Sequence, residues 1–174
     1  MKELNTAVVA SLRSFGVEAV SIHPLHGCET SDGELIPHSA GHLRRMIELG
    51  LVPVIHGDVV MDQVRGACIV SGDQLIRVLA EDLEMDRVGL ATDVPGLLAE
   101  DGSVVRELRR SMAHQVTIGR SDKIDVTGGM EGKIAELLSL ADHGIRFEIF
   151  HISQIEAFLA GEEHGGTRIL PEDA

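Results

Sequence analysis

The chain has 174 residues, of which 44% are hydrophobic and 25% charged, and this composition is typical of one globular domain with a substantial core. Its formal net charge of −13 and aromatic content of 2% argue against a nucleic-acid partner, which needs a basic face or a stacking platform. The two cysteines lack metal-ligand spacing, and the sequence shows neither an apolar run of membrane length nor a signal-peptide pattern. We therefore expect a cytoplasmic protein with no membrane partner.

Hydrophobic periodicity predicts that helices and strands alternate from the first residues onward. In the first part of the chain, the predicted helices span residues 4–15 and 39–49, and the predicted strands residues 17–22, 52–55 and 67–70. The connector 24–37 carries the turn signal Asp32-Gly33 and is predicted to form a hairpin or a flap. The run 67–70 leads directly into a helix that opens at Ser71.

The second part of the chain continues this alternation. Predicted strands span residues 87–91, 145–150 and 166–170, a hairpin is predicted around Asp101-Gly102, and helices are predicted after Gly129 and over 155–159. The spacing of Ser153 and Glu156 predicts a capping box for the last helix. Because no repeat or linker interrupts the pattern, we expect a single α/β domain over residues 1–174, with a mainly parallel sheet covered on both faces.

Two glycines, Gly128 and Gly129, open a predicted helix in the segment 123–133. A helix start with bare backbone N–H groups carries about half a positive charge and binds anions. Lys133 leans back toward this helix start, where its ammonium opposes the helix dipole unless an anion is present. The pattern indicates a phosphate site, and it leaves open the alternative of a glycine-rich turn with an exposed lysine.

Gly72 stands at the start of another predicted helix and offers a second anion site. The alternative is a plain N-cap, because Ser71 and Asp73 both cap helices without a ligand. Asp93 follows the predicted strand 87–91, and ligands of open α/β sheets gather beyond the carboxyl ends of strands. Asp93 is therefore a candidate contact for a ribose, a metal or an adenine amino group, and the alternative is a turn before the following Pro-Gly.

The densest histidine set carries no recognised metal motif. It consists of His23, His26, Cys28, His38 and His42. His38 and His42 are four residues apart, but no acidic residue completes a His-Glu-x-x-His pattern, so we predict no metal ligands in the site. Walker, Rossmann and Gly-x-Ser-x-Gly patterns are absent as well, which leaves a phosphate site of another kind.

Five segments together resemble the archaeal-type isopentenyl phosphate kinases, which are members of the amino acid kinase superfamily. These segments are residues 52–60, 69–75, 91–96, 125–133 and 166–169. The most specific is Asp-Val-Thr-Gly-Gly-Met, followed by a lysine four residues after its second glycine. The resemblance runs nearly from end to end and implies a three-layer α/β/α sandwich, the amino acid kinase fold.

The resemblance also implies a reaction, in which the γ-phosphoryl group of ATP moves, with Mg²⁺, onto isopentenyl phosphate to give isopentenyl diphosphate for isoprenoid biosynthesis. The implied site residues are Gly72 and Asp73 for the acceptor phosphate, Asp93, Gly128, Gly129 and Lys133 for ATP, and Lys133 as the catalytic residue. Two helix starts and a lysine fit a phosphoryl transfer that works by positioning and charge neutralisation.

The chain departs from the family pattern in two places. The family domain begins with a Lys-x-Gly-Gly-Ser loop and then a glycine-rich loop ending in histidine, and Met1 falls after both, so we expect its N-terminal third to be missing. Pro95 replaces an acidic residue that usually follows Thr-Asp-Val. We therefore expect a split enzyme or a homodimer that covers the exposed sheet edge, with little activity from the chain alone. The alternatives are a catalytically dead nucleotide-binding or oligomerisation remnant, and a related kinase with another small phosphate or phosphonate acceptor.

Overall fold

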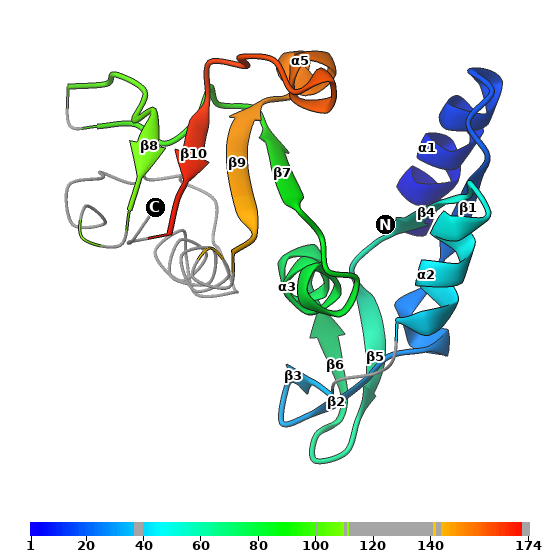
Figure 1. The fold of residues 1–174 in the computed structure, drawn as a ribbon. Coiled ribbons are helices and arrows are strands. Elements are labelled where there is room, and N and C mark those ends of the chain that lie inside the picture. The colour runs from blue at the N-terminus through cyan, green and yellow to red at the C-terminus, as the bar shows by residue number, and fades with distance from the viewer. Residues whose placement is uncertain (37–39, 100, 110, 112–140, 142–143, 172–174) are drawn as a thin grey trace. The chain divides into compact units, whose positions relative to one another are not determined.

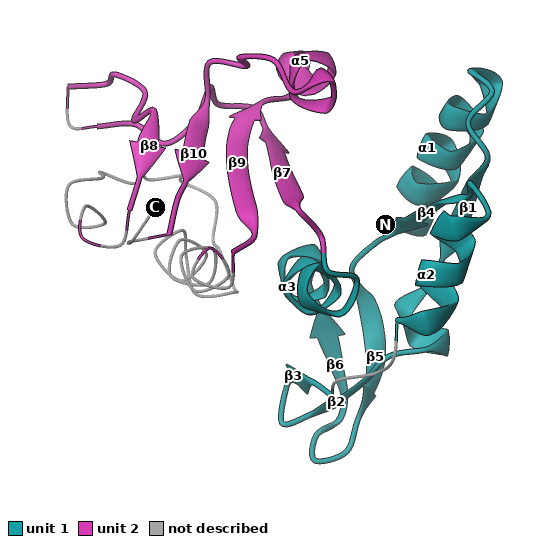
Figure 2. Ribbon diagram, viewed as in Figure 1, with its two compact units in different colours: residues 1–84 teal, residues 85–174 magenta. Residues whose placement is uncertain are grey.

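The structure, a computed structural model, describes residues 1–36, 40–99, 101–109, 111, 141 and 144–171 (Figure 1). The chain divides into two compact units, residues 1–84 and residues 85–174, and each unit is described by itself (Figure 2). The expectation of a single domain stays a prediction.

The first unit combines helices with two small sheets. Its helices are α1 (Lys2–Ser14), the 3-10 helix η1 (Pro24–His26), α2 (Gly41–Glu48) and α3 (Gly72–Asp82). Its strands are β1 (Ala19–Ile22), β2 (Glu29–Ser31), β3 (Glu34–Leu35), β4 (Val52–Ile55), β5 (Asp58–Asp62) and β6 (Gly66–Val70). The strands β1 and β4 pair in parallel, with Ile22 beside Ile55, and both α1 and α2 contact this pair.

The second sheet of this unit has the order β3-β2-β5-β6. The hairpin β2–β3 confirms the turn predicted at Asp32-Gly33, where both residues have the positive φ that such a turn requires. The strands β5 and β6 pair antiparallel, with Asp58 beside Val70. One face of this sheet meets α3 in a core cluster formed by Leu35, Val60, Val70 and Leu75.

The second unit is built on one four-stranded sheet. Its elements are β7 (Arg87–Thr92), β8 (Glu107–Leu108), β9 (Arg146–His151), the 3-10 helix η3 (Ile152–Gln154), α5 (Ile155–Ala160) and β10 (Thr167–Ile169). The strand order is β7-β9-β10-β8, with β7 parallel to β9 and β10 antiparallel to it. Gly89 of β7 is required by packing, because a Cβ there would lie 2.6 Å from the Phe158 ring of α5.

One sequence expectation needs correction, and one strand was missed. The capping box before α5 is absent, because the N-cap is Gln154 without a side-chain bond and the Ser153 N–H instead donates to Nδ1 of His151. The strand β5 was not predicted. Its antiparallel pairing with β6, like that of β9 with β10, interrupts the parallel pattern that the alternation of helices and strands suggested.

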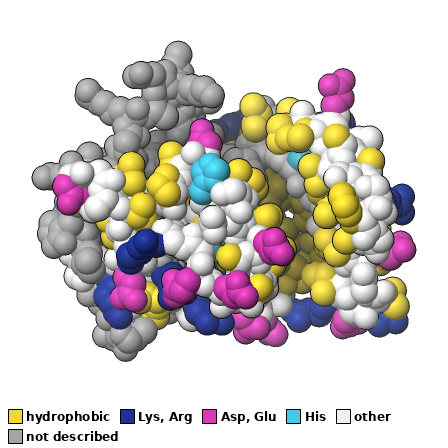
Figure 3. Space-filling model, turned by 90° about the horizontal axis from the view of Figure 1, so that it is seen from above, with side chains coloured by type: hydrophobic (Ala, Val, Ile, Leu, Met, Phe, Trp, Pro, Cys, Tyr) yellow, Lys and Arg dark blue, Asp and Glu magenta, His cyan; other side chains and the backbone are white. Residues whose placement is uncertain are grey.

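The described surface is mixed in charge. On the face shown in Figure 3, acidic and basic side chains are interspersed among polar and hydrophobic ones. Among the residues that the structure describes, no helix has both the length and the apolar character for crossing a membrane.

Candidate functional site

The start of α3 is shaped by a capping box, so the N-cap alternative for this segment is correct as far as Ser71 is concerned. The Ser71 hydroxyl accepts a hydrogen bond from the Gln74 N–H at 3.2 Å, and the Ser71 N–H donates to Oε1 of Gln74 at 3.0 Å. The cap does not use the N–H of Gly72, which is exposed and has no hydrogen-bond partner among the described residues. An anion can therefore still bind at this helix start.

The space in front of Gly72 is open. A Cβ built on Gly72 meets no atom within 4 Å, outside the backbone of its own helix. On one side the Gly57 backbone approaches so closely that its Cβ position lies 3.5 Å from the Gly72 nitrogen. The turn of residues 56–58, between β4 and β5, therefore borders the start of α3. Asp73 lies in the first turn of α3, as the sequence predicts.

Asp58, the first residue of β5, was missed as a functional residue. Its Oδ1 accepts a hydrogen bond from the Val59 N–H at 3.0 Å, whereas its Oδ2 is buried and has no hydrogen-bond partner among the described residues. Lys2 places its Nζ 3.9 Å from this oxygen. The segment 52–60 is one of those that carry the family resemblance, but no sequence signal marks Asp58 as a carboxylate with a buried oxygen that lacks a donor among the described residues.

Two histidines lie beside this turn. Nδ1 of His23 and Nε2 of His56 are 2.8 Å apart, and Nδ1 of His56 is 2.9 Å from the carbonyl oxygen of Gly57. Together with Asp58 they form the candidate metal-binding group of the described residues, because their ligand atoms all lie within 4.8 Å of one another. Of the histidine set considered in the sequence, His23 is the one described member that belongs to this metal-binding group. His38 lies outside the described residues.

Asp93 follows β7 in the second unit and is exposed. The hydroxyl of Thr92 forms the polar contacts of this turn, accepting from the Val94 N–H at 3.1 Å and donating to the Val94 carbonyl at 2.9 Å. The Asp93 carboxylate takes no part in these contacts and remains available to a ligand. The other predicted nucleotide contacts, Gly128, Gly129 and Lys133, lie outside the described residues.

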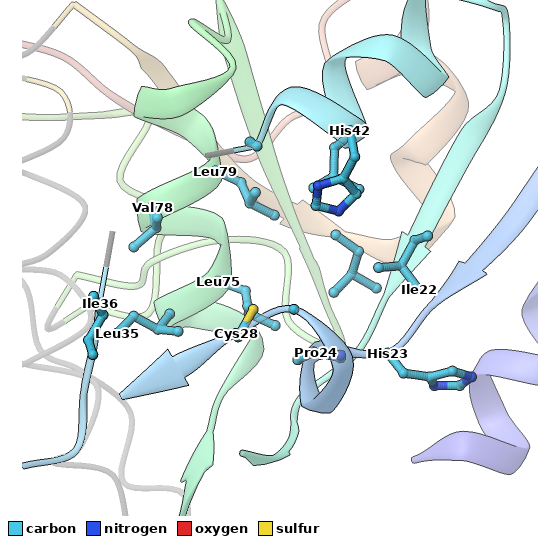
Figure 4. Close-up of a pocket in the computed structure, with 14 residues that line it drawn as sticks. Ile22, His23, Pro24, Cys28, Leu35, Ile36, His42, Leu75, Val78 and Leu79 are labelled. Carbon is cyan, nitrogen blue, oxygen red and sulfur yellow. The ribbon is translucent and has the colours of Figure 1, made fainter. Parts of the chain in front are cut away.

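An apolar cavity of about 60 Å³ lies within the first unit, between α2, α3 and the β2–β3 segment (Figure 4). Leu75, Val78 and Leu79 of α3 line it together with Cys28 and Leu35. Burial raises the pKa of the Cys28 thiol, so this side chain is a neutral part of the lining. The cavity continues the core behind α3 and presents few polar atoms.

The opposite face of the β5–β6 hairpin carries apolar side chains that are exposed. Val59 and Ile69 are direct cross-strand neighbours, with exposed fractions of 50% and 75%, and Met61 is 59% exposed on the same face. Val59 and Ile69 are one step along the hairpin from Asp58 and Val70, which pair beside the start of α3. The exposed apolar surface therefore lies one residue pair from the start of α3 in the register of the hairpin.

Comparison with known proteins agrees with this architecture. The model of the Amino acid kinase family matches residues 1–151, so the chain belongs to the amino acid kinase family. Within that family it is similar to an isopentenyl phosphate kinase of Haloferax volcanii, at 44% identity over 95% of this chain and 65% of the relative. An isopentenyl phosphate kinase of Methanothermobacter thermautotrophicus is 37% identical over 97% of this chain and 67% of the relative.

Solved structures give the same result. An isopentenyl phosphate kinase structure with 34% sequence identity superimposes with a TM-score of 0.80 over 97% of this chain and 65% of that protein. The product complex of the Thermoplasma acidophilum enzyme, at 21% identity and a TM-score of 0.71, supports the fold alone. These comparisons confirm the amino acid kinase fold and the resemblance to isopentenyl phosphate kinases. The chain spans about two thirds of the length of these relatives.

Proposed function

We propose that this chain forms part of an ATP-dependent kinase that phosphorylates isopentenyl phosphate to isopentenyl diphosphate. The observation that carries the proposal is the exposed residue Gly72, whose N–H has open space before it and no hydrogen-bond partner among the described residues, in a chain 44% identical to a protein of that activity. In this proposal Gly72, with Asp73 beside it, receives the acceptor phosphate. The exposed Val59 and Ile69 then contact the short apolar tail of the acceptor.

The proposed nucleotide site uses Asp93, Gly128, Gly129 and Lys133. Lys133 is the proposed catalytic residue, whose ammonium neutralises charge that develops on the transferring phosphoryl group. Asp93 is an exposed oxygen donor of the kind that Mg²⁺ prefers, so it fits a Mg²⁺ ion that arrives with ATP. When bound, the ion supplies charge neutralisation across the phosphates.

We also propose that the chain acts as a homodimer in the cytoplasm. Leu4 and Val8 of α1 and its C-cap residue Phe15 are exposed by 59%, 39% and 85%, and a second copy would cover such side chains. Both cysteines are free thiols, which suits a reducing compartment.

The proposal is tested by calorimetric titration of the chain with isopentenyl phosphate and, separately, with ATP and Mg²⁺. Gly72→Asp places a negative charge at the anion site and leaves the helix intact, since an acidic residue is favourable at a helix start. We expect it to weaken isopentenyl phosphate binding at least about fivefold, because two like charges 4 Å apart repel by about 1–4 kcal/mol.

Gly27→Asp is the matched control, since a Cβ on Gly27 also meets no atom within 4 Å. Lys133→Ala should weaken ATP binding and leave the acceptor titration unchanged. If neither ligand binds, the chain is a catalytically dead remnant that serves oligomerisation. If ATP binds and isopentenyl phosphate does not, a panel of small phosphates and phosphonates identifies the acceptor.

A further inference from the structure

The ends of two paired strands bring His23 and His56 together. The strands β1 and β4 run parallel with Ile22 beside Ile55, so the residues that follow, His23 and His56, leave the sheet at the same edge. Asp58 follows two residues after His56 and opens β5. The His56 residue is buried, with 6% of its surface exposed, and the Asp58 side chain is 15% exposed. Side chains that are 33 residues apart in sequence thus share one largely buried place.

The outer nitrogen of His56 is committed to donating a hydrogen bond. Nδ1 of His56 lies 2.9 Å from the Gly57 carbonyl oxygen, which can only accept. Nε2 of His23 lies 3.4 Å from the Ser21 hydroxyl, and that hydroxyl donates its own hydrogen to Oδ1 of Asn5. The Asn5 amide is oriented by its Nδ2, which donates to the Val54 carbonyl at 2.9 Å. The Ser21 oxygen has a lone pair toward His23, but at 3.4 Å this contact does not decide which nitrogen of His23 carries the proton.

Because Nδ1 of His56 donates to the Gly57 carbonyl, Nε2 of His56 is an acceptor that points at Nδ1 of His23. The two nitrogens are 2.8 Å apart, which is the length of a hydrogen bond from His23 to His56, and a bound metal would take the place of that proton. The Asp58 carboxylate is close by, and its buried Oδ2 has no hydrogen-bond donor among the described residues. Two imidazole nitrogens and one carboxylate oxygen thus lie within 4.8 Å of one another, with the exposed Lys2 ammonium 3.9 Å from the carboxylate.

We propose that His23, His56 and Asp58 bind a divalent first-row transition metal, of which Zn²⁺ is the expected ion. Imidazole and carboxylate ligands suit Zn²⁺, whereas Mg²⁺ prefers oxygen ligands alone. A ring whose second nitrogen donates to a backbone carbonyl, as in His56, has the orientation usual for a zinc ligand. At Zn–N distances of about 2.0–2.1 Å in a tetrahedral site, the two nitrogens need to separate to roughly 3.3 Å. A small rotation of the partly exposed His23 ring provides this, and the fourth position remains open to water.

Lys2 is the competing cation at this carboxylate. Its Nζ lies 3.9 Å from Oδ2 of Asp58, but its side chain is 61% exposed and leaves the site at little cost. His23 belongs to the lining of the apolar cavity, but in Figure 4 its ring points away from the other labelled residues. A bound metal would tie β1, β4 and β5 together at the turn that borders Gly72.

The test is titration of the chelator-treated chain with Co²⁺, which reports its geometry by visible absorption, followed by displacement with Zn²⁺. We expect one ion per chain and a tetrahedral cobalt spectrum. His56→Gln and His23→Gln should each weaken metal binding by more than about 100-fold. Loss of a residue that only hydrogen-bonds to a metal ligand costs up to about that much, and loss of a ligand should cost more. Lys2→Met should bind at least as tightly as the original chain.

His26→Gln is the matched control, because His26 is exposed and its ring centroid lies 6.1 Å from that of His23, outside the group. Circular dichroism of each variant separates loss of a ligand from loss of fold, and Asp58→Asn provides a variant that retains both rings. An absent cobalt spectrum, equal binding by the ligand variants, or thiolate charge-transfer absorption from Cys28 or Cys68 would overturn the proposal. The readout uses neither ATP nor isopentenyl phosphate, so its failure is distinct from failure of the proposed kinase function.

Discussion

Gly57 lies against the backbone of Val70, so that a Cβ on Gly57 would stand 2.9 Å from the Val70 carbonyl oxygen. This contact joins the turn of residues 56–58 to the last residue of β6, and α3 begins directly after Ser71. Only glycine fits this approach without displacing backbone. The start of α3 is therefore positioned by the turn that also carries His56 and Asp58.

We predict that Gly57→Ala destabilises the chain by about 1–3 kcal/mol, the usual cost of overpacking, and shifts the start of α3. Urea denaturation measures the change in the free energy of unfolding. Gly72→Ala is the matched control, because its Cβ meets open space and alanine is the better helix former. Equal stability of the Gly57→Ala and Gly72→Ala variants would show that the close approach is not tight in solution.

A second prediction concerns the buried carboxylate of Glu148 in the second unit. Its Oε2 accepts a hydrogen bond from Nε2 of His164 at 2.5 Å, and its Oε1 lies 3.3 Å from Nη2 of Arg87. The Gly166 N–H donates to Nδ1 of His164 at 3.1 Å, which leaves Nε2 as the donor to Glu148. We predict that Glu148→Ala costs about 3–5 kcal/mol, because it removes the partner of two largely buried groups.

The matched control is Glu163→Ala, whose carboxylate pairs with Arg168 at 2.7 Å but is 80% exposed. An exposed ion pair contributes less than about 1 kcal/mol. The Glu163–Arg168 pair should therefore matter less than the Glu148–Arg87 pair, although its contact is shorter. Thermal and urea denaturation of both variants measure the difference. The burial argument is wrong if the two variants lose the same stability.

The sequence predicted the parts of this chain whose signals are local. The Asp32-Gly33 turn, the helix after Ser71 and the strand ending at Thr92 each depend on neighbouring residues, and each is present. The group of His23, His56 and Asp58 depends instead on the register of β1 against β4, which single-sequence periodicity does not specify. The strand β5 likewise depends on its pairing with β6, because the segment of residues 58–62 carries no local signal of its own.

The failed capping box shows how a local signal can lose to a competing contact. Ser153 and Glu156 have the required spacing, but His151 lies two residues before Ser153 and its ring accepts the Ser153 N–H. The hydroxyl of Ser153 is also 2.8 Å from the same ring nitrogen, so it is not available to cap α5. The chain therefore makes a 3-10 turn at Ile152–Gln154 before the helix begins.

A third prediction concerns acid stability and Asp62. The pKa of this carboxyl lies well below its usual value, first because it accepts a hydrogen bond from the Arg65 N–H. Burial opposes this effect, and hydrogen bonds from the Gly33 and Val64 N–H groups add to it. A pKa lower in the folded than in the unfolded chain adds stability above the unfolded value of about 3.9, and this stability is lost as the pH falls below it. Asp62→Asn should therefore be less stable than the original chain at pH 7, with a difference that shrinks below about pH 4. Denaturation at a series of pH values measures this, with the exposed Asp82→Asn as control, and a pH-independent difference would contradict it.

The last prediction separates the apolar tail from the phosphate of the proposed acceptor. Ile69 is 75% exposed and faces Val59 across the hairpin, one residue pair from the turn beside Gly72. Ile69→Gln removes roughly 1 kcal/mol of apolar contact and should weaken isopentenyl phosphate binding about 3- to 10-fold. Binding of inorganic phosphate, which has no tail, should not change.

Ile47→Gln is the control for a general loss of surface hydrophobicity, because Ile47 is 48% exposed on α2. Calorimetric titration with both ligands gives the ratio of the two affinities for each variant. If the affinity for isopentenyl phosphate relative to that for inorganic phosphate falls in Ile69→Gln and not in Ile47→Gln, the tail lies on the β5–β6 face. If the ratio instead falls after Val78→Ala, the tail enters the apolar cavity behind α3, and the exposed face serves contact between chains rather than substrate binding.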